Sequence, residues 1–175
     1  METSKKHLHS LFLFILAFIC LVWSAAPAFA ADPPEKWQLT LGGSGTTTTV
    51  DDSQSAFGLN ASIGRTGHLL LPLEAGLRQG IAYASPNGGS TTLSTRVYVD
   101  ATLVHYKAID FFAGGNVGLA YGNMKSQWRA APEVGLRCWL WPNVAVIGRV
   151  EYPFDLNDGS ATDTLEYFVG LQVAF

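Results

Sequence analysis

The chain has 175 residues, of which 48% are hydrophobic, and its 11 basic and 14 acidic residues give a net charge of −3. This length allows one domain, and the absence of a basic patch excludes an extended nucleic-acid-binding surface. After residue 30 no apolar run is long enough to cross a bilayer as a helix. If the chain enters a membrane, it has to do so as a closed sheet.

The first 30 residues have the three parts of a secretory signal peptide. Lys5 and Lys6 precede an apolar run at 11–23, and the small residues Ala28 and Ala30 indicate cleavage after Ala30. The apolar run is shorter than the roughly 20 residues that a membrane-spanning helix needs. We therefore expect a signal peptide at 1–30, a short polar tail at 31–36 and one barrel domain at 37–175. Cys138 is then the only cysteine, which excludes an internal disulfide.

The rest of the chain divides into eight alternating segments, a pattern typical of an all-β barrel or sandwich. The expected strands are 37–43, 55–64, 69–83, 92–106, 109–122, 128–140, 144–154 and 165–175. Tight connections at 65–67, 107–108 and 141–143 alternate with longer ones at 44–54, 84–91, 123–127 and 155–164. Short turns at one end and longer loops at the other are typical of transmembrane barrels. The even strand number places both ends of the barrel chain on one side.

Charged residues share one face of these strands, because within each strand they are an even number of positions apart. They are Glu74, Arg78, Arg96, Asp100, Asp110, Arg129, Glu133, Arg137, Arg149, Glu151 and Glu166. The opposite face carries mainly Leu, Val and Ile and, in the expected strands, no charge. Its polar exceptions are Gln79, Thr95 and His105, whereas the charged face includes the apolar Leu70, Val104, Ile147 and Phe168.

Two kinds of barrel fit this alternation. A soluble, lipocalin-like carrier turns its apolar face inward around a ligand, whereas a transmembrane barrel turns it toward lipid. The charged face carries five Arg and six carboxylates and no Lys. Arg is suited to bidentate pairing, and unpaired buried charge is costly, so this balance favours a packed lumen. We therefore predict an eight-stranded antiparallel up-and-down transmembrane β-barrel.

Aromatic residues on the apolar face are expected near the two strand ends, with aliphatic residues between them. Such a distribution is typical of the aromatic girdles at membrane interfaces. The long-loop group comprises Phe57, Tyr83, Tyr121, Trp128, Tyr152 and Tyr167, and the short-turn group Trp37, Phe111, Trp141 and Phe175.

A short repeat, Glu-x-Gly-Leu-Arg, occurs at 74–78 and again at 133–137. Its Glu, Gly and Arg share the charged face, and Gly leaves room for long neighbouring side chains. We expect a lumenal ion-pair network that plugs the barrel, formed by Glu74, Arg78, Arg96, Asp100, Arg129, Glu133, Arg137, Arg149, Glu151 and Glu166. An interior of eight strands is just wide enough for its own side chains, so no general pore is expected.

The last strand alternates Tyr167, Val169, Leu171, Val173 and Phe175 on one face and ends on the aromatic residue. This pattern resembles the C-terminal assembly signal of bacterial outer-membrane barrels. With the signal peptide, it makes the chain from Trp37 onward similar to the small eight-stranded outer-membrane β-barrel proteins, the class of the OmpA transmembrane domain and OmpX. The resemblance implies export by a cleaved signal peptide, insertion by the barrel-assembly machinery with periplasmic chaperones, and contact with outer-membrane lipid and lipopolysaccharide.

Some barrels of this size are lipid-modifying enzymes that hydrolyse or transfer acyl chains with a His, a Ser and an acid. The mature histidines His68 and His105 both map to the short-turn end, without such a constellation, so we expect no catalytic site. Residues 155–159 resemble a calcium loop only superficially, because the Gly is at position five and no Glu closes the loop. We expect neither metal nor cofactor.

The function that these observations favour is that of a monomeric, non-enzymatic integral outer-membrane protein with a structural or surface-interaction role. The alternatives are an acyl hydrolase or transferase of the outer membrane and a soluble, lipocalin-like periplasmic carrier.

Overall fold

In the computed structural model, the described residues are 36–48, 56–84, 90–122, 126–157, 159–160, 162 and 164–175. All of them belong to one compact unit, Asp32–Phe175. The expected signal peptide, its cleavage site at Ala30 and most of the tail lie outside the described residues. Within the described part, no helix has the length and apolar character that crossing a bilayer requires.

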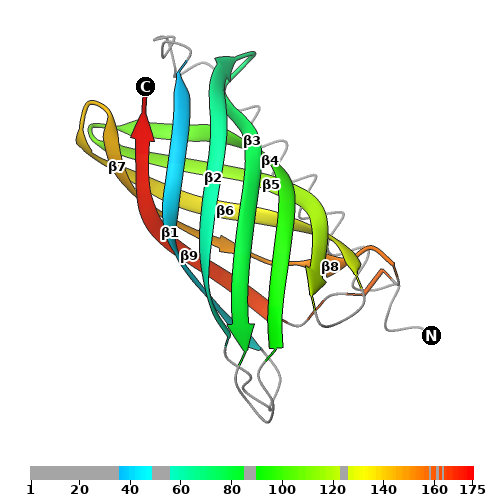
Figure 1. Ribbon diagram of the computed structural model, residues 1–175. Helices are drawn as coiled ribbons and strands as arrows, with labels where there is room; N and C mark the ends of the chain where they lie inside the picture. The colour runs from blue at the N-terminus through cyan, green and yellow to red at the C-terminus, as the bar shows by residue number, and fades with distance from the viewer. Residues whose placement is uncertain are drawn as a thin grey trace. The chain divides into compact units, whose positions relative to one another are not determined.

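Nine strands form one antiparallel sheet (Figure 1). They are β1 (Trp37–Thr48), β2 (Ala56–His68), β3 (Pro72–Ala84), β4 (Ser90–Tyr106), β5 (Ile109–Gly122), β6 (Gln127–Trp141), β7 (Val144–Glu151), β8 (Phe154–Asp155) and β9 (Thr164–Ala174). Sequence neighbours pair from β1 to β7, and β7 pairs with β9. The pairing of β9 with β1 closes the ring, and Figure 1 shows these two strands side by side. The seam ends in reciprocal backbone hydrogen bonds of 2.9 Å between Trp37 and Phe175.

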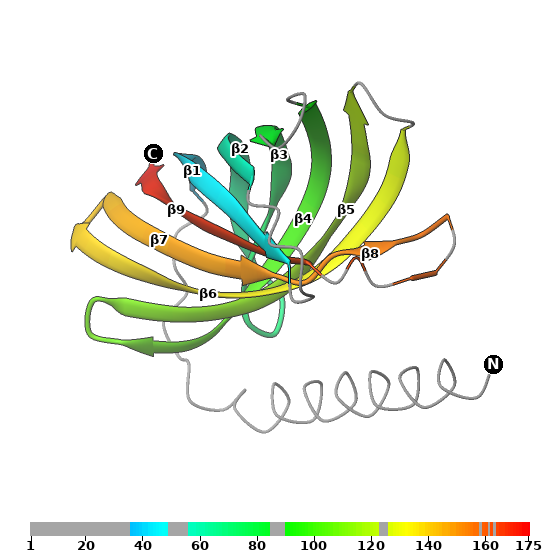
Figure 2. The same cartoon turned by 90° about the horizontal axis from the view of Figure 1, so that it is seen from below.

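The two-residue strand β8 is the continuation of β7, so the closed barrel has eight strands. Glu133 pairs with Glu151, and Arg129 pairs with Asp155, in one unbroken register against β6. Pro153 lies between β7 and β8 and has no N–H to donate, which interrupts the ladder there. The prediction of an eight-stranded antiparallel barrel is confirmed, and Figure 2 shows its strands curving around a common interior.

The predicted turn at 65–67 is wrong, since β2 continues to His68 and the turn is at 69–71. Thr66 is held extended by Lys36, which donates its N–H to Thr66 Oγ1 at 2.9 Å and accepts the Thr66 N–H at 2.9 Å. Gly67 pairs with Leu73 inside the ladder. Leu70 and Leu71 therefore lie in the turn and not in the next strand, and their exposure is the reverse of the prediction: Leu70 is exposed and Leu71 is buried.

Strand β1 is also longer than expected. The Gly- and Thr-rich segment after residue 43, expected to be a loop, pairs with β2 on one side and with β9 on the other up to Thr46. Two-sided backbone pairing offsets the weak strand preference of Gly. The short connection at 107–108 is as predicted, whereas the one predicted at 141–143 is shorter by one residue because Trp141 belongs to β6.

The outer face of the described strands is mainly apolar, with one charged exception, Arg65, which was predicted to lie in a turn. Because β2 continues past residue 64, Arg65 points outward at the short-turn end, where its guanidinium lies 5.9 Å from the ring centre of Trp37. A long cationic side chain next to an aromatic ring is common at membrane interfaces. Exposed aromatic residues lie near both rims: Trp37, Tyr106, Phe111, Trp141 and Phe175 at the short-turn rim, and Phe57, Tyr83, Trp128 and Tyr167 at the other. Tyr106 was not predicted, and the predicted Tyr121 and Tyr152 are only partly exposed.

Candidate functional site

The two Glu-x-Gly-Leu-Arg motifs face each other across the lumen. They lie on β3 and β6, which run in opposite directions, so the Glu of each motif meets the Arg of the other. Arg78 donates from Nη1 to Glu133 Oε2 at 2.8 Å and from Nη2 to Glu133 Oε1 at 2.9 Å. Arg137 Nη2 donates to Glu74 Oε2 at 2.7 Å. All four side chains are buried.

Glu151 is the acceptor on which the middle of the lumen converges. It receives hydrogen bonds from Arg78 at 2.9 Å, Arg96 at 2.6 Å and Arg149 at 2.8 Å. Asn116 Nδ2 bridges Glu151 and Glu133, at 3.1 and 2.7 Å. Several donors around one carboxylate are what a buried ion-pair cluster needs to offset the loss of water.

Glu74 and Asp110 make further contacts toward the short-turn end of the lumen. Besides Arg137, Glu74 accepts a hydrogen bond from Tyr98 Oη at 2.6 Å and from Gln172 Nε2 at 3.2 Å. Asp110 lies 3.8 Å from Arg137 and accepts the Trp139 indole N–H at 2.6 Å. Both carboxylates therefore have neutral donors as well as an Arg.

Arginine side chains also stack on aromatic rings that point inward. The guanidinium of Arg149 lies 4.0 Å from the ring centre of Phe168, that of Arg78 4.6 Å from Tyr98, and that of Arg137 5.2 Å from Phe112. Ile147, Phe112 and Phe168 form a small buried apolar cluster. The inward-facing Gly135 leaves room for a long neighbouring side chain, because the Phe112 ring occupies the space that a Cβ of Gly135 would need.

Two members of the predicted network have no ion pair among the described residues. Arg129 donates to Gln127 at 2.9 Å, and no carboxylate of the described residues is within salt-bridge distance. Asp100 is buried, and its Oδ1 atom has no hydrogen-bond partner there. The remaining eight residues, Glu74, Arg78, Arg96, Glu133, Arg137, Arg149, Glu151 and Glu166, are joined by ion pairs.

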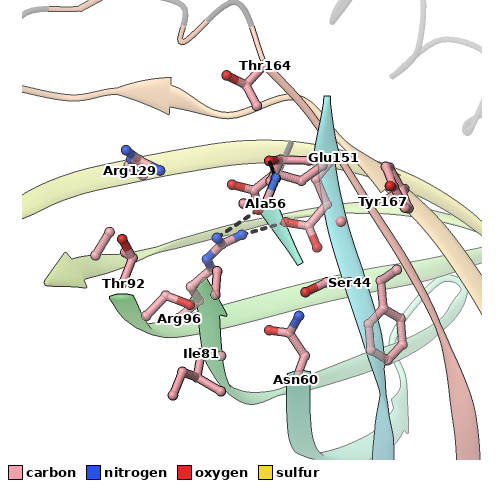
Figure 3. A pocket seen from close by; sticks show the side chains of 18 of the residues that line it. Ser44, Ala56, Asn60, Ile81, Thr92, Arg96, Arg129, Glu151, Thr164 and Tyr167 are labelled. Atoms are coloured by element: carbon pink, nitrogen blue, oxygen red, sulfur yellow. Dashed lines mark hydrogen bonds and ion pairs between the residues drawn. The ribbon is translucent and has the colours of Figure 1, made fainter. Parts of the chain in front are cut away.

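A hollow of about 230 Å³ lies above this cluster, at the long-loop end of the lumen. Arg96 lines this hollow, where it bonds Glu151 at 2.6 Å and Glu166 at 2.8 Å. Figure 3 shows Arg96 and Glu151 at the hollow. Ser44 and Asn60 project into the same space from β1 and β2. The hollow exists because these two strands carry only small or uncharged inward residues at this level.

His105 lies on the opposite face from the one predicted. A β-bulge between Thr102 and Val104 inserts one extra residue into β4, which reverses the alternation for the rest of the strand. Val104 is therefore exposed on the outer face, and His105 Nδ1 lies 2.5 Å from Asp110 Oδ1. Nothing in the sequence marks this bulge.

His105 and Asp110 form a pair at the short-turn end of the barrel. In the described part of the chain, the pair has no Ser or Thr hydroxyl bonded to the imidazole. The described residues also contain no cluster of three or more His, Cys, Asp or Glu that could hold a metal ion. The exposed Cys138 is a free thiol on the outer face.

Comparison with known proteins agrees with this architecture at the level of the fold. No protein-family profile and no curated protein matches the sequence. Among solved structures, neisserial surface protein A (NspA) has a TM-score of 0.59 and 13% sequence identity, over 83% of this chain and 99% of NspA. The attachment invasion locus protein Ail of Yersinia pestis has a TM-score of 0.50 and 14% identity, over 81% and 99%.

This chain has the fold of the small outer-membrane β-barrel proteins. The similarity extends over nearly the full length of the NspA and Ail chains. At 13–14% identity it concerns the fold alone, and what this barrel does has to be argued from its own residues.

Proposed function

We propose that the protein is a monomeric integral protein of the bacterial outer membrane, with a structural or surface-interaction role and no enzymatic activity. The observation that carries this proposal is the inversion of polarity. Between two aromatic rims the described outer face carries mainly apolar side chains, and apart from Arg65 the charged residues of the strands lie inside. A protein in water has no reason to expose such a surface, whereas hydrocarbon requires one. The similarity in fold to NspA and Ail supports the same location.

The proposal includes the route by which the protein reaches the membrane. A signal peptide cleaved after Ala30 directs export, and periplasmic chaperones and the barrel-assembly machinery recognise the terminal strand. Its residues Tyr167, Val169, Leu171, Val173 and Phe175 are all exposed on one face, which supports a role in assembly. The short-turn end then faces the periplasm, and the long loops face outward to lipopolysaccharide and external partners.

Membrane fractionation combined with heat-modifiable gel mobility tests this location. Folded outer-membrane barrels resist detergent without heating, so the unheated and heated protein should migrate differently. We expect the processed chain in the outer-membrane fraction with such a shift. Recovery from the periplasm as a dissolved species would contradict the proposal and favour the lipocalin-like alternative.

We further propose that the lumenal ion pairs plug the barrel. Support comes from the burial of Arg78, Glu133, Arg149 and Glu151, whose contacts extend from β3 to β6 and β7 across the interior. In planar bilayers we expect no stable large conductance. A sustained open channel in the wild-type protein would contradict the plug without affecting the proposed location.

The enzymatic alternative is tested through its most plausible base. Refolded protein incubated with lipopolysaccharide should release no fatty acid. Turnover that disappears in His105→Ala would show instead that the His105–Asp110 pair is catalytic.

A further inference from the structure

Three polar side chains form a hydrogen-bonded cluster on the outer face of the described strands, which we call the Gln79 triad. It consists of Gln79 on β3, Thr95 on β4 and Tyr121 on β5, three adjacent strands. Thr95 Oγ1 donates to Gln79 Oε1 at 2.7 Å, and Gln79 Nε2 donates to Tyr121 Oη at 3.1 Å. The Thr95 and Tyr121 hydroxyls are 3.2 Å apart. All three contacts are exposed on the face that the proposed function turns toward lipid.

The donor count of the triad leaves one group without a partner. The Thr95 hydroxyl hydrogen is used by Gln79, and the Tyr121 hydroxyl can donate its hydrogen to Thr95. The Gln79 amide has two N–H groups, and one of them bonds Tyr121. The second N–H has no acceptor among the described residues. In an apolar surrounding an unpaired donor of this kind is costly.

The position of the triad indicates which acceptor is available. Gln79 is four residues from the exposed girdle residue Tyr83 on the same strand, and Tyr121 lies at the same end of β5. The triad therefore lies at the inner edge of the aromatic girdle of the long-loop rim, with Tyr121 on the girdle side. At this depth a bilayer presents the carbonyl groups that link its acyl chains.

The neighbours of the triad are uncharged. Outward residues next to it on β3 and β4 are Leu77, Ile81, Leu93 and Val97. No Lys or Arg of the described outer face lies at this end of the barrel, since Arg65 is at the other. Among the described residues a phosphate group would meet no cation on this face, which favours an uncharged acceptor carried on a hydrocarbon chain.

We propose that the Gln79 triad binds an acyl-linkage carbonyl of lipopolysaccharide, with the free Gln79 N–H as donor. This rests on the proposed function, which places the long-loop end in the outer leaflet, where lipopolysaccharide is the lipid. Its amide- and ester-linked hydroxyacyl chains offer the carbonyl acceptor, and their hydroxyls can donate to the lone pairs that Thr95 and Tyr121 retain. The triad is thus a lipid-recognition site of this barrel.

Side-chain amide NMR in lipid nanodiscs tests the site. The wild-type protein is reconstituted with deuterated phospholipid and protonated lipopolysaccharide, and then with the labels reversed. We expect nuclear Overhauser effects from the Gln79 amide protons to the acyl methylene next to a carbonyl of lipopolysaccharide in the first sample only. Contacts in the second sample alone, or in neither, would overturn the proposal.

Native mass spectrometry supplies the mutational test. Gln79→Leu removes the amide donor and replaces it with an apolar side chain of similar size. Leu93→Ile is the matched control on the neighbouring strand. Loss of one charge-neutral hydrogen bond should reduce retained lipopolysaccharide roughly fivefold in Gln79→Leu, whereas the control keeps the wild-type amount. Equal retention in the two variants would overturn the proposal.

Heat-modifiable mobility of every sample separates this proposal from the proposed function. A wild-type barrel that inserts and shifts on heating, but shows no Gln79-dependent lipid contact, overturns the triad site alone. A wild-type chain that never enters the bilayer overturns both.

Discussion

At the scale of single residues, the lumen is organised by crossed pairing of two short motifs. Residues four apart on a strand are too far from each other to bond, so neither motif can neutralise itself. Placed on oppositely directed strands, Glu74 meets Arg137 and Arg78 meets Glu133. The repeat is therefore a device for matching charge across the barrel, and each pair depends on the other strand.

The Arg137 pair provides the first prediction. Arg137→Met should lower the free energy of unfolding by about 3 kcal/mol, because it leaves the buried Glu74 carboxylate without its cation. Equilibrium urea unfolding in detergent measures this change. The double variant Glu74→Gln with Arg137→Met is the control, and it should recover most of the loss because residue 74 no longer carries a charge that needs the cation. If the double variant lost as much stability as Glu74→Gln and Arg137→Met lose together, the pairing would be contradicted.

Packing of an aromatic ring on Gly provides the second prediction. The Cζ atom of Phe112 lies where Gly135→Ala would place its methyl group, and the Gly148 carbonyl oxygen is also in contact. The variant should be destabilised by about 1–3 kcal/mol through overpacking. Gly148→Ala is the matched control, because the nearest atom to its Cβ is 4.0 Å away. Thermal unfolding followed by circular dichroism distinguishes the two variants. Equal unfolding midpoints would show that the Phe112 ring can move aside without loss of stability.

At the scale of elements, the alternation of charge and hydrophobicity predicted eight strands and nearly all of their faces. It misplaced strand ends where a backbone ladder overrides local preference, as at Ser44 to Thr46 in β1 and at Thr66 in β2. It also missed the bulge near Thr102, because one inserted residue shifts the register without a residue-type signal. The ion-pair partners, 55 residues apart for Arg78 and Glu133, follow from ring closure and could not be read from spacing.

The terminal strand carries a prediction about assembly. Phe175→Ser keeps the backbone bonds to Trp37 but removes the exposed ring that ends the outward row of β9. We expect less heat-modifiable protein in the outer membrane of an expressing cell, measured by quantitative immunoblot. Phe175→Tyr retains an interfacial aromatic and should behave like the wild type. Wild-type amounts of the Ser variant would show that the terminal ring has no part in assembly.

At the scale of the whole molecule, one arrangement explains both surfaces of the sheet. Ring closure pairs each of the eight barrel strands with a neighbour on both sides, and the side-chain alternation places charged residues inside and apolar residues outside. Paired arginines and carboxylates fill the middle and the short-turn half, whereas the long-loop half keeps a polar hollow. A soluble barrel has its apolar residues inside, so a water-facing exterior would not explain the apolar outer face or the charged interior.

Solvent accessibility of spin labels in proteoliposomes tests that orientation most directly. In a Cys138→Ser background, labels are attached at Leu77→Cys and Val134→Cys on the outer face, and at Ser44→Cys in the hollow. We predict that oxygen relaxes the two outer labels while a water-soluble nickel chelate does not reach them, and that the label at Ser44 shows the reverse. Nickel access at Leu77 and Val134, with none at Ser44, would contradict the account.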